Sequence, residues 1–151
     1  RDHSIEVQIP FVQAMAGALT ERLSIIPISL MLQDLQTTTE IANSLVNVLQ
    51  KNNGPFLILG SSDLTHYETQ KSASKKDRKL LDDALKLDPP SFYKTLQRLN
   101  VTACGYGAIS VVMQVSKALS KKTGSLLKYA TSGDSSGDTS SVVGYSSVHY
   151  S

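Results

Sequence analysis

The alternation of helical and strand-like patterns along the chain is the feature that most restricts its fold. Apolar residues recur at helical spacing in residues 4–19, 32–52, 74–88, 91–100 and 104–122. Runs that are uniformly apolar or alternate in strand fashion occupy residues 23–30, 56–60, 125–134 and 140–150. Helices that alternate with strands predict an α/β domain, with a mixed sheet packed between helices.

The composition indicates a folded domain. With 151 residues, 40% hydrophobic and 19% charged, the chain is long enough and apolar enough to form a core, so we expect a single domain over 1–151. The net charge is only +2, and the basic cluster at residues 71–79 also includes Asp77. That cluster is typical of a solvated helix face, and we expect no binding to nucleic acid.

Other features bear on where the protein works. No apolar stretch approaches the roughly 18 residues that span a membrane, so we expect no membrane association. The single cysteine, Cys104, cannot form an internal disulfide, which favours a reducing, cytoplasmic location. The chain begins at Arg1 rather than methionine, and we expect that its start was removed or that it is the C-terminal part of something larger. Pro10 is expected to kink or restart the first helix.

Polar residues follow directly after the short apolar run at residues 56–60. The segment "LGSSDLTHYE" (59–68) supplies Ser61, Ser62, Asp63 and His66. In open α/β sheets, functional groups collect beyond the carboxyl ends of the strands, so we expect these side chains to be functional. A hydrolase would use a serine as nucleophile, His66 as base and Asp63 to orient it. The chain lacks the G-x-S-x-G elbow, and a triad within six residues seldom reaches the required geometry.

A metal site is the alternative for the same segment. Imidazole, thiolate and carboxylate groups from separate segments make such sites, and Cys104 opens a predicted helix whose dipole favours its thiolate. Further candidates near the start of the chain are Asp2, His3 and Glu6. Equally, Cys104 is of a residue type that is often simply buried. His66, steered by Asp63, can instead move a proton to a bound substrate.

The sequence gives less support for a functional role of the remaining histidine and of two tyrosines. His149 lies in the alternating segment "SVHYS" and is expected to be a strand residue without a chemical role. Tyr106 and Tyr145 can line a pocket, although tyrosines more often pack with a satisfied hydroxyl.

Four stretches taken together resemble one protein family. They are "DHSIEVQIPFVQ" (2–13), "LGSSDLTHYE" (59–68), "TACGYGAIS" (102–110) and "YATSGDSSGDTSSVVGYSSV" (129–148). In this order, across nearly the whole chain, they resemble the C-terminal half of MEMO-like proteins. The resemblance implies a fold like that of class III extradiol dioxygenases, in which two histidines and a glutamate hold iron and a further histidine is the acid/base.

The resemblance also implies roles for particular residues. MEMO-like proteins have two histidines and a cysteine in the ligand positions, and the match places the cysteine ligand at Cys104. It places the further histidine at His66, beside Asp63, and implies that His3 and Glu6 support the pocket. Tyr106 and Gly107 stand where some relatives have Arg-His, and we expect Tyr106 to line that pocket.

The two histidine ligands of the family belong to an N-terminal half that this chain does not contain, so its ligand set is incomplete. We therefore expect the missing N-terminal half or a second subunit as partner. The resemblance implies iron or copper as cofactor, with zinc as a third option, and sulfur favours copper(I) or zinc over ferrous iron. A sheet built from both halves would expose an edge or an apolar face in this chain.

The resemblance leaves three functions open. The first is metal-dependent redox or oxygen chemistry by a dioxygenase-like oxidoreductase, acting on a small aromatic or peptide-like ligand. The second is a non-catalytic module that binds a peptide, such as one containing phosphotyrosine, in the same pocket. The third is an accessory role beside a radical SAM or AMMECR-type partner.

Overall fold

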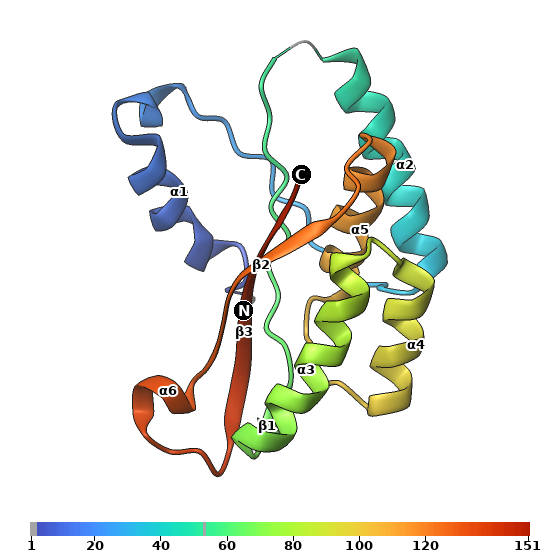
Figure 1. Cartoon of the computed structure of the whole chain (residues 1–151). Coiled ribbons are helices and arrows are strands. Elements are labelled where there is room, and N and C mark those ends of the chain that lie inside the picture. The colour runs from blue at the N-terminus through green and yellow to red at the C-terminus, as the bar shows by residue number, and fades with distance from the viewer. Residues whose placement is uncertain (1–2, 53) are drawn as a thin grey trace. The chain divides into compact units, whose positions relative to one another are not determined.

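The computed structural model describes residues 3–52 and 54–151 (Figure 1). It contains two compact units, Arg1–Met31 and Leu32–Ser151. The first unit contains the 3-10 helix η1 (Glu6–Gln8), helix α1 (Ile9–Ala16) and the 3-10 helix η2 (Gly17–Arg22). Pro10 lies in the first turn of α1, where its missing N–H costs no helical hydrogen bond, so the predicted restart is confirmed. A single domain over 1–151 stays a prediction.

The second unit combines helices with a small sheet. Its elements in chain order are α2 (Leu35–Lys51), β1 (His66–Glu68), α3 (Gln70–Leu85), α4 (Pro89–Leu99), α5 (Tyr106–Ala118), β2 (Gly124–Thr131), α6 (Gly133–Ser136) and β3 (Val142–Tyr150). The side chains of Asp34, Thr69 and Asp88 cap α2, α3 and α4 by accepting a backbone N–H three residues later. Among the described residues, no helix has the length and apolar character needed to cross a membrane.

The sheet has the order β1-β3-β2, and both pairings are antiparallel. The expected α/β class is confirmed, but the sheet is antiparallel rather than mixed. Strands β2 and β3 correspond to the two C-terminal segments predicted from alternation. Between them, the polar stretch at 132–141 is an ordered connection that contains α6.

Two predicted strands are wrong. In the described chain, residues 23–30 and 56–60 form neither strand nor helix. A uniformly apolar run signals burial on two faces, but a strand also needs a neighbour that pairs with its backbone. These runs instead expose large side chains, with Ile26 at 85% and Leu57 at 77%.

These exposed apolar runs lead to a testable expectation. We expect the chain by itself to self-associate or to be poorly soluble, because unpaired apolar segments associate in water. Light scattering over a range of concentrations measures this, and Leu57→Glu should weaken the association. A wild-type chain that stays monomeric at every concentration would contradict the expectation.

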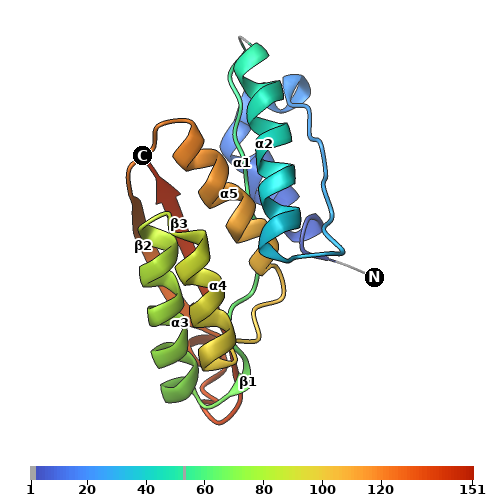
Figure 2. The ribbon, with the colours of Figure 1, turned by 90° about the vertical axis from the view of Figure 1, so that its right-hand side faces the viewer.

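The core of the second unit holds the segments that form the site. Helix α3 packs on all three strands, and α4 and α5 pack against α3 (Figure 2). The fully or nearly buried core residues are Leu64, Leu80, Leu81, Ala84, Leu87, Phe92, Val101, Ala103 and Met113. Two of them, Leu64 and Ala103, belong to the loops before β1 and before α5, so burial anchors both loops.

The basic cluster at residues 71–79 lies on α3 and is only partly the solvated face that the sequence predicts. Lys71, Lys75 and Lys79 are exposed. Asp77, in contrast, is completely buried. Asp77 differs from these lysines because the helical period turns only every third or fourth side chain of α3 toward the sheet.

Candidate metal centre

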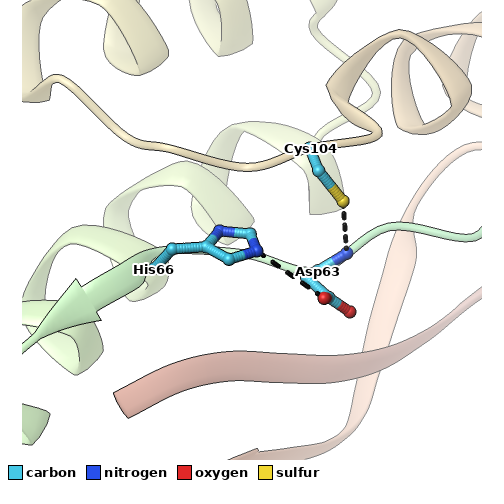
Figure 3. A group of neighbouring side chains, drawn as sticks. All are labelled: Asp63, His66 and Cys104. Carbon is cyan, nitrogen blue, oxygen red and sulfur yellow. Dashed lines mark hydrogen bonds and ion pairs between the residues drawn. The ribbon is translucent and has the colours of Figure 1, made fainter. Parts of the chain in front are cut away.

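Two segments far apart in the sequence bring three potential metal ligands together. Asp63 comes from the loop that leads into β1, His66 is the first residue of β1, and Cys104 comes from the turn before α5. One ligand atom from each of the three lies within 4.8 Å of the others (Figure 3). Asp63 and His66 are partly buried, whereas Cys104 is exposed.

Hydrogen bonds from backbone N–H groups to side-chain acceptors hold the two segments against each other. The Asp63 N–H donates to Cys104 Sγ at 3.4 Å, and the Gly105 N–H donates to Ser62 Oγ at 2.9 Å. Glycine is required at position 105, because a Cβ there would lie 2.5 Å from the carbonyl oxygen of Ser61. The close approach of these backbones therefore sets the position of the thiol relative to the carboxylate.

The imidazole of His66 is oriented by its surroundings. Its Nε2 lies 3.6 Å from Asp63 Oδ2, and its backbone N–H donates to Thr102 Oγ1 at 2.7 Å. The other ring nitrogen, Nδ1, is buried and has no hydrogen-bond partner among the described residues. The ring thus turns its Nε2 edge toward the carboxylate and the thiol (Figure 3).

This geometry argues against the serine-hydrolase alternative. The Ser62 hydroxyl donates to the Asp63 carbonyl at 2.7 Å and accepts the Gly105 N–H, so both of these contacts are to the backbone. In a catalytic triad the carboxylate binds Nδ1 and the nucleophile faces Nε2. In this protein Asp63 faces Nε2 of His66 instead.

Gln33 is a supporting residue that the sequence patterns did not indicate. Its Nε2 donates to the carbonyl of Cys104 at 3.0 Å, and its Oε1 accepts the N–H of Gly107 at 2.8 Å. The Tyr93 hydroxyl donates to the Gln33 carbonyl at 2.5 Å. Gln33 thereby fixes both ends of the turn that presents the thiol. No motif links it to a cysteine 71 residues later.

The structure places the pocket residues suggested by the resemblance as follows. His3 Nδ1 and Glu6 Oε2 lie 2.9 Å apart in the first unit, both exposed, and their expected role in the pocket stays a prediction. Asp2 lies outside the described residues. The ring of Tyr106 packs edge-on against Tyr93, with centroids 5.8 Å apart.

The other two aromatic candidates lie on β3. The pKa of Tyr145 is raised, first by partial burial and then by the negative charge of Asp63, so its phenol lies within electrostatic reach of the site. His149 pairs with Ser125 of β2 and is exposed, which confirms it as a strand residue.

An ion pair next to the site gives a pH-dependent prediction. Glu68 of β1 accepts hydrogen bonds from Lys76 and Ser72, and these lower its pKa from the ordinary value of 4.5, the Lys76 bond most. Because the pKa of Glu68 is lower in the folded than in the unfolded protein, its ionised carboxylate stabilises the fold at pH values above the unfolded-state pKa. That stabilisation is lost as the pH falls through the folded-state pKa. We expect Glu68→Gln to lower the free energy of unfolding by about 1 kcal/mol at neutral pH.

As the pH falls below 4.5 and then through the lowered pKa of folded Glu68, the unfolding curves of wild type and Glu68→Gln should converge. Urea titrations at several pH values measure the difference. Glu40→Gln is the matched control, because Glu40 accepts a bond from the neutral amide of Gln36. A difference between wild type and Glu68→Gln that stays constant from neutral to acidic pH would contradict the assignment.

Comparison with known proteins gives the family. The model of the Memo-like protein family matches residues 1–149. The chain belongs to the Memo-like family. It is 43% identical over 150 residues to a MEMO1 family protein of Nitrosopumilus maritimus, covering 99% of this chain and 53% of that protein. The resemblance drawn from the four motifs is thereby confirmed.

Two further relatives show the same relation. A MEMO1 family protein of Methanosarcina acetivorans is 41% identical over 147 residues, covering 97% of this chain and 54% of the relative. A MEMO1 family protein of Sulfolobus acidocaldarius is 41% identical over 149 residues, covering 99% of this chain and 51% of the relative. The chain therefore spans about half the length of the curated Memo-like relatives that it matches.

Proposed function

We propose that this Memo-like chain forms one wall of a metal-binding pocket. In it, Cys104 is a metal ligand, and His66 and Asp63 have one of two roles: they complete the donor set, or as an imidazole–carboxylate pair they hold or move a proton beside the metal. The observation that supports the proposal is that sulfur, imidazole and carboxylate donors from two separate segments of the chain lie within 4.8 Å of one another. The alternative of a buried structural cysteine is disfavoured, because Cys104 is exposed.

The donor set fits a transition metal. Thiolate sulfur and imidazole nitrogen are preferred ligands of zinc, copper and iron, and carboxylate oxygen also binds zinc and iron. Ligand atoms around a tetrahedral ion with bonds of about 2.1 Å lie about 3.4 Å apart. The 3.6 Å between His66 Nε2 and Asp63 Oδ2 is close to that spacing. The thiol sulfur of Cys104 lies within 4.8 Å of one ligand atom of His66 and one of Asp63.

We propose iron or copper as the metal, as the family resemblance implies, with zinc as a third candidate. Within this set, the sulfur ligand favours copper(I) or zinc over ferrous iron. When bound, such a metal supplies redox or Lewis-acid chemistry, as in a dioxygenase-like oxidoreductase. The chain's own residues orient a ligand and handle its proton: Asp63 faces Nε2 of His66, the ring nitrogen on the side of Cys104. The missing N-terminal half, or a second subunit, would supply the remaining ligands.

Metal titration tests the proposal. We expect the protein to bind Zn²⁺ and Co²⁺, with a sulfur-to-cobalt charge-transfer band in the Co²⁺ complex. Cys104→Ser should abolish that band and lower the affinity about 100-fold, since ligands of structural and catalytic metals are not replaceable by a neutral hydroxyl. His66→Ala should lower the affinity less, by about 10-fold.

His149→Ala is the control, because this histidine is exposed on β3 and is not part of the donor group formed by Asp63, His66 and Cys104. It should leave both affinity and spectrum unchanged. The proposal fails if wild type binds no metal, or if Cys104→Ser binds it as tightly as wild type does.

A further inference from the structure

Asp77 of α3 is a buried carboxylate that no ion pair neutralises. Its side chain is completely buried, and none of the ion pairs in the described part of the chain involves it. Burying a carboxylate is costly unless hydrogen bonds replace its water. Asp77 therefore requires an explanation.

Three donors converge on this carboxylate. Its Oδ1 accepts the backbone N–H of Thr65 at 3.0 Å and the Thr65 hydroxyl at 2.6 Å. Its Oδ2 accepts the hydroxyl of Tyr129, from β2, at 2.8 Å. Burial is the main cause that raises the pKa of Tyr129 to about 12, and the bond to Asp77 adds to it, so the phenol keeps its proton as a donor. An ionised carboxylate, which only accepts, matches three donors.

The residue that Asp77 binds lies inside the donor segment of the metal site. Thr65 is fully buried and immediately precedes His66, two positions after Asp63. Its carbonyl accepts the N–H of Gly144. All polar groups of Thr65 are therefore hydrogen-bonded, either to Asp77 of α3 or to Gly144 of β3. The N–H of Leu64 donates to the Gly144 carbonyl at 2.9 Å. The stretch between the two site residues is thus fixed to α3 and β3.

The carboxylate has no room to move. Asp77 Oδ2 lies so close to Gly144 that a Cβ at that glycine would be 2.0 Å from it. A threonine or serine in place of Asp77 would offer a single oxygen to three donors. The carboxylate of Asp77 has two oxygens, so that Oδ1 can bind Thr65, which precedes β1, while Oδ2 binds Tyr129 of β2.

We propose that Asp77 is a positioning residue of the metal site: through Thr65 it holds Asp63 and His66 at the distance from Cys104 at which the three groups serve one metal ion. The proposal rests on the proposed function. It assigns Asp77 no contact with metal or substrate. Because Asp77 acts through the backbone between Asp63 and His66, its loss should displace both together.

The first readout needs no metal. In metal-free protein we expect a nuclear Overhauser contact between the His66 ring and the Cys104 side chain, which lie together in the structure. Asp77→Ala should weaken or remove this contact. Asp77→Asn should retain it, because the amide oxygen still accepts from Thr65 and the amide nitrogen can donate to Tyr129. Thr65→Val keeps the shape and removes only the hydroxyl, so its effect should be intermediate.

The second readout is Zn²⁺ affinity. Removing a supporting partner of a metal ligand typically lowers affinity by about 10- to 100-fold, and we expect a loss in this range for Asp77→Ala. Asp77→Asn should retain most of the affinity. Phe92→Leu is the stability control, since it disturbs the shared hydrophobic core from α4 but removes none of the hydrogen bonds that Asp77 makes to Thr65 and Tyr129.

The outcomes separate the two proposals. The positioning role is overturned if Asp77→Ala and Thr65→Val keep both the contact and the affinity, or if Phe92→Leu lowers the affinity as much. If Asp77→Ala does not fold, Thr65→Val decides alone. A wild-type protein that shows the contact but binds no Zn²⁺ overturns the metal site, and with it the purpose assigned to Asp77. Loss of the contact with Asp77→Ala, together with weaker Zn²⁺ binding, supports both.

Discussion

Gly144→Ala should be among the most destabilising single substitutions in this protein. The new methyl group would lie 2.0 Å from Asp77 Oδ2 and 3.3 Å from Leu64 Cβ, and both side chains are buried. The carboxylate can retreat only by breaking bonds to Thr65 and Tyr129. Overpacking and unsatisfied buried groups together should cost about 3–5 kcal/mol.

Urea unfolding measures this loss. Gly54→Ala is the matched control, because its Cβ would meet only Asn52 Oδ1, at an ordinary 3.4 Å. A double variant sharpens the test: in the Asp77→Ala background, Gly144→Ala should cost much less, since the clashing oxygen is gone. Equal costs in both backgrounds, or a single variant within about 1 kcal/mol of wild type, would show that the contact with Asp77 is not what requires glycine.

The sequence allowed the helices to be predicted better than the sheet, for a physical reason. Helices are local, so apolar spacing and capping residues such as Asp34 and Thr69 specify them within a few residues of their observed ends. Strands depend on partners elsewhere in the chain. The alternating segments that form β2 and β3 pair with each other, whereas the apolar run at 56–60 pairs with no strand among the described residues. The short, polar strand β1 gave no pattern to detect.

The candidate site was predictable only in part. Asp63 and His66 lie in one motif, and chemical reasoning singled them out directly. Cys104 joins them through the family resemblance, since nothing local reveals a contact across about 40 residues. Gln33 escaped notice for the same reason. Asp77 was misjudged as part of a solvated cluster because that cluster also holds the exposed Lys71, Lys75 and Lys79, and composition does not reveal which side of a helix is buried.

Gly105→Ala should disable the site by separating its two loops. A Cβ at this position would lie 2.5 Å from the Ser61 carbonyl oxygen, 2.8 Å from Ser62 Cβ and 3.1 Å from Ser62 Cα. Two of these neighbours are backbone atoms, which a rotamer change cannot move. The turn must therefore shift away, and the Gly105 N–H bond to Ser62 is lost with it. We expect a destabilisation of about 2–3 kcal/mol.

The larger effect should be on metal binding, because the shifted turn displaces the thiol of Cys104 from Asp63 and His66. We expect Zn²⁺ affinity to fall about 100-fold, as for loss of a ligand, together with the sulfur-to-cobalt band. Gly54→Ala again serves as control and should bind as wild type does. Among the described residues, only a few hydrogen bonds connect the two segments. A Gly105→Ala variant that remains folded and binds Zn²⁺ normally would mean that the thiol reaches the metal from a displaced turn. The close approach at Gly105 would then contribute to stability alone, and the metal would depend on the side chains rather than on the spacing of the two backbones.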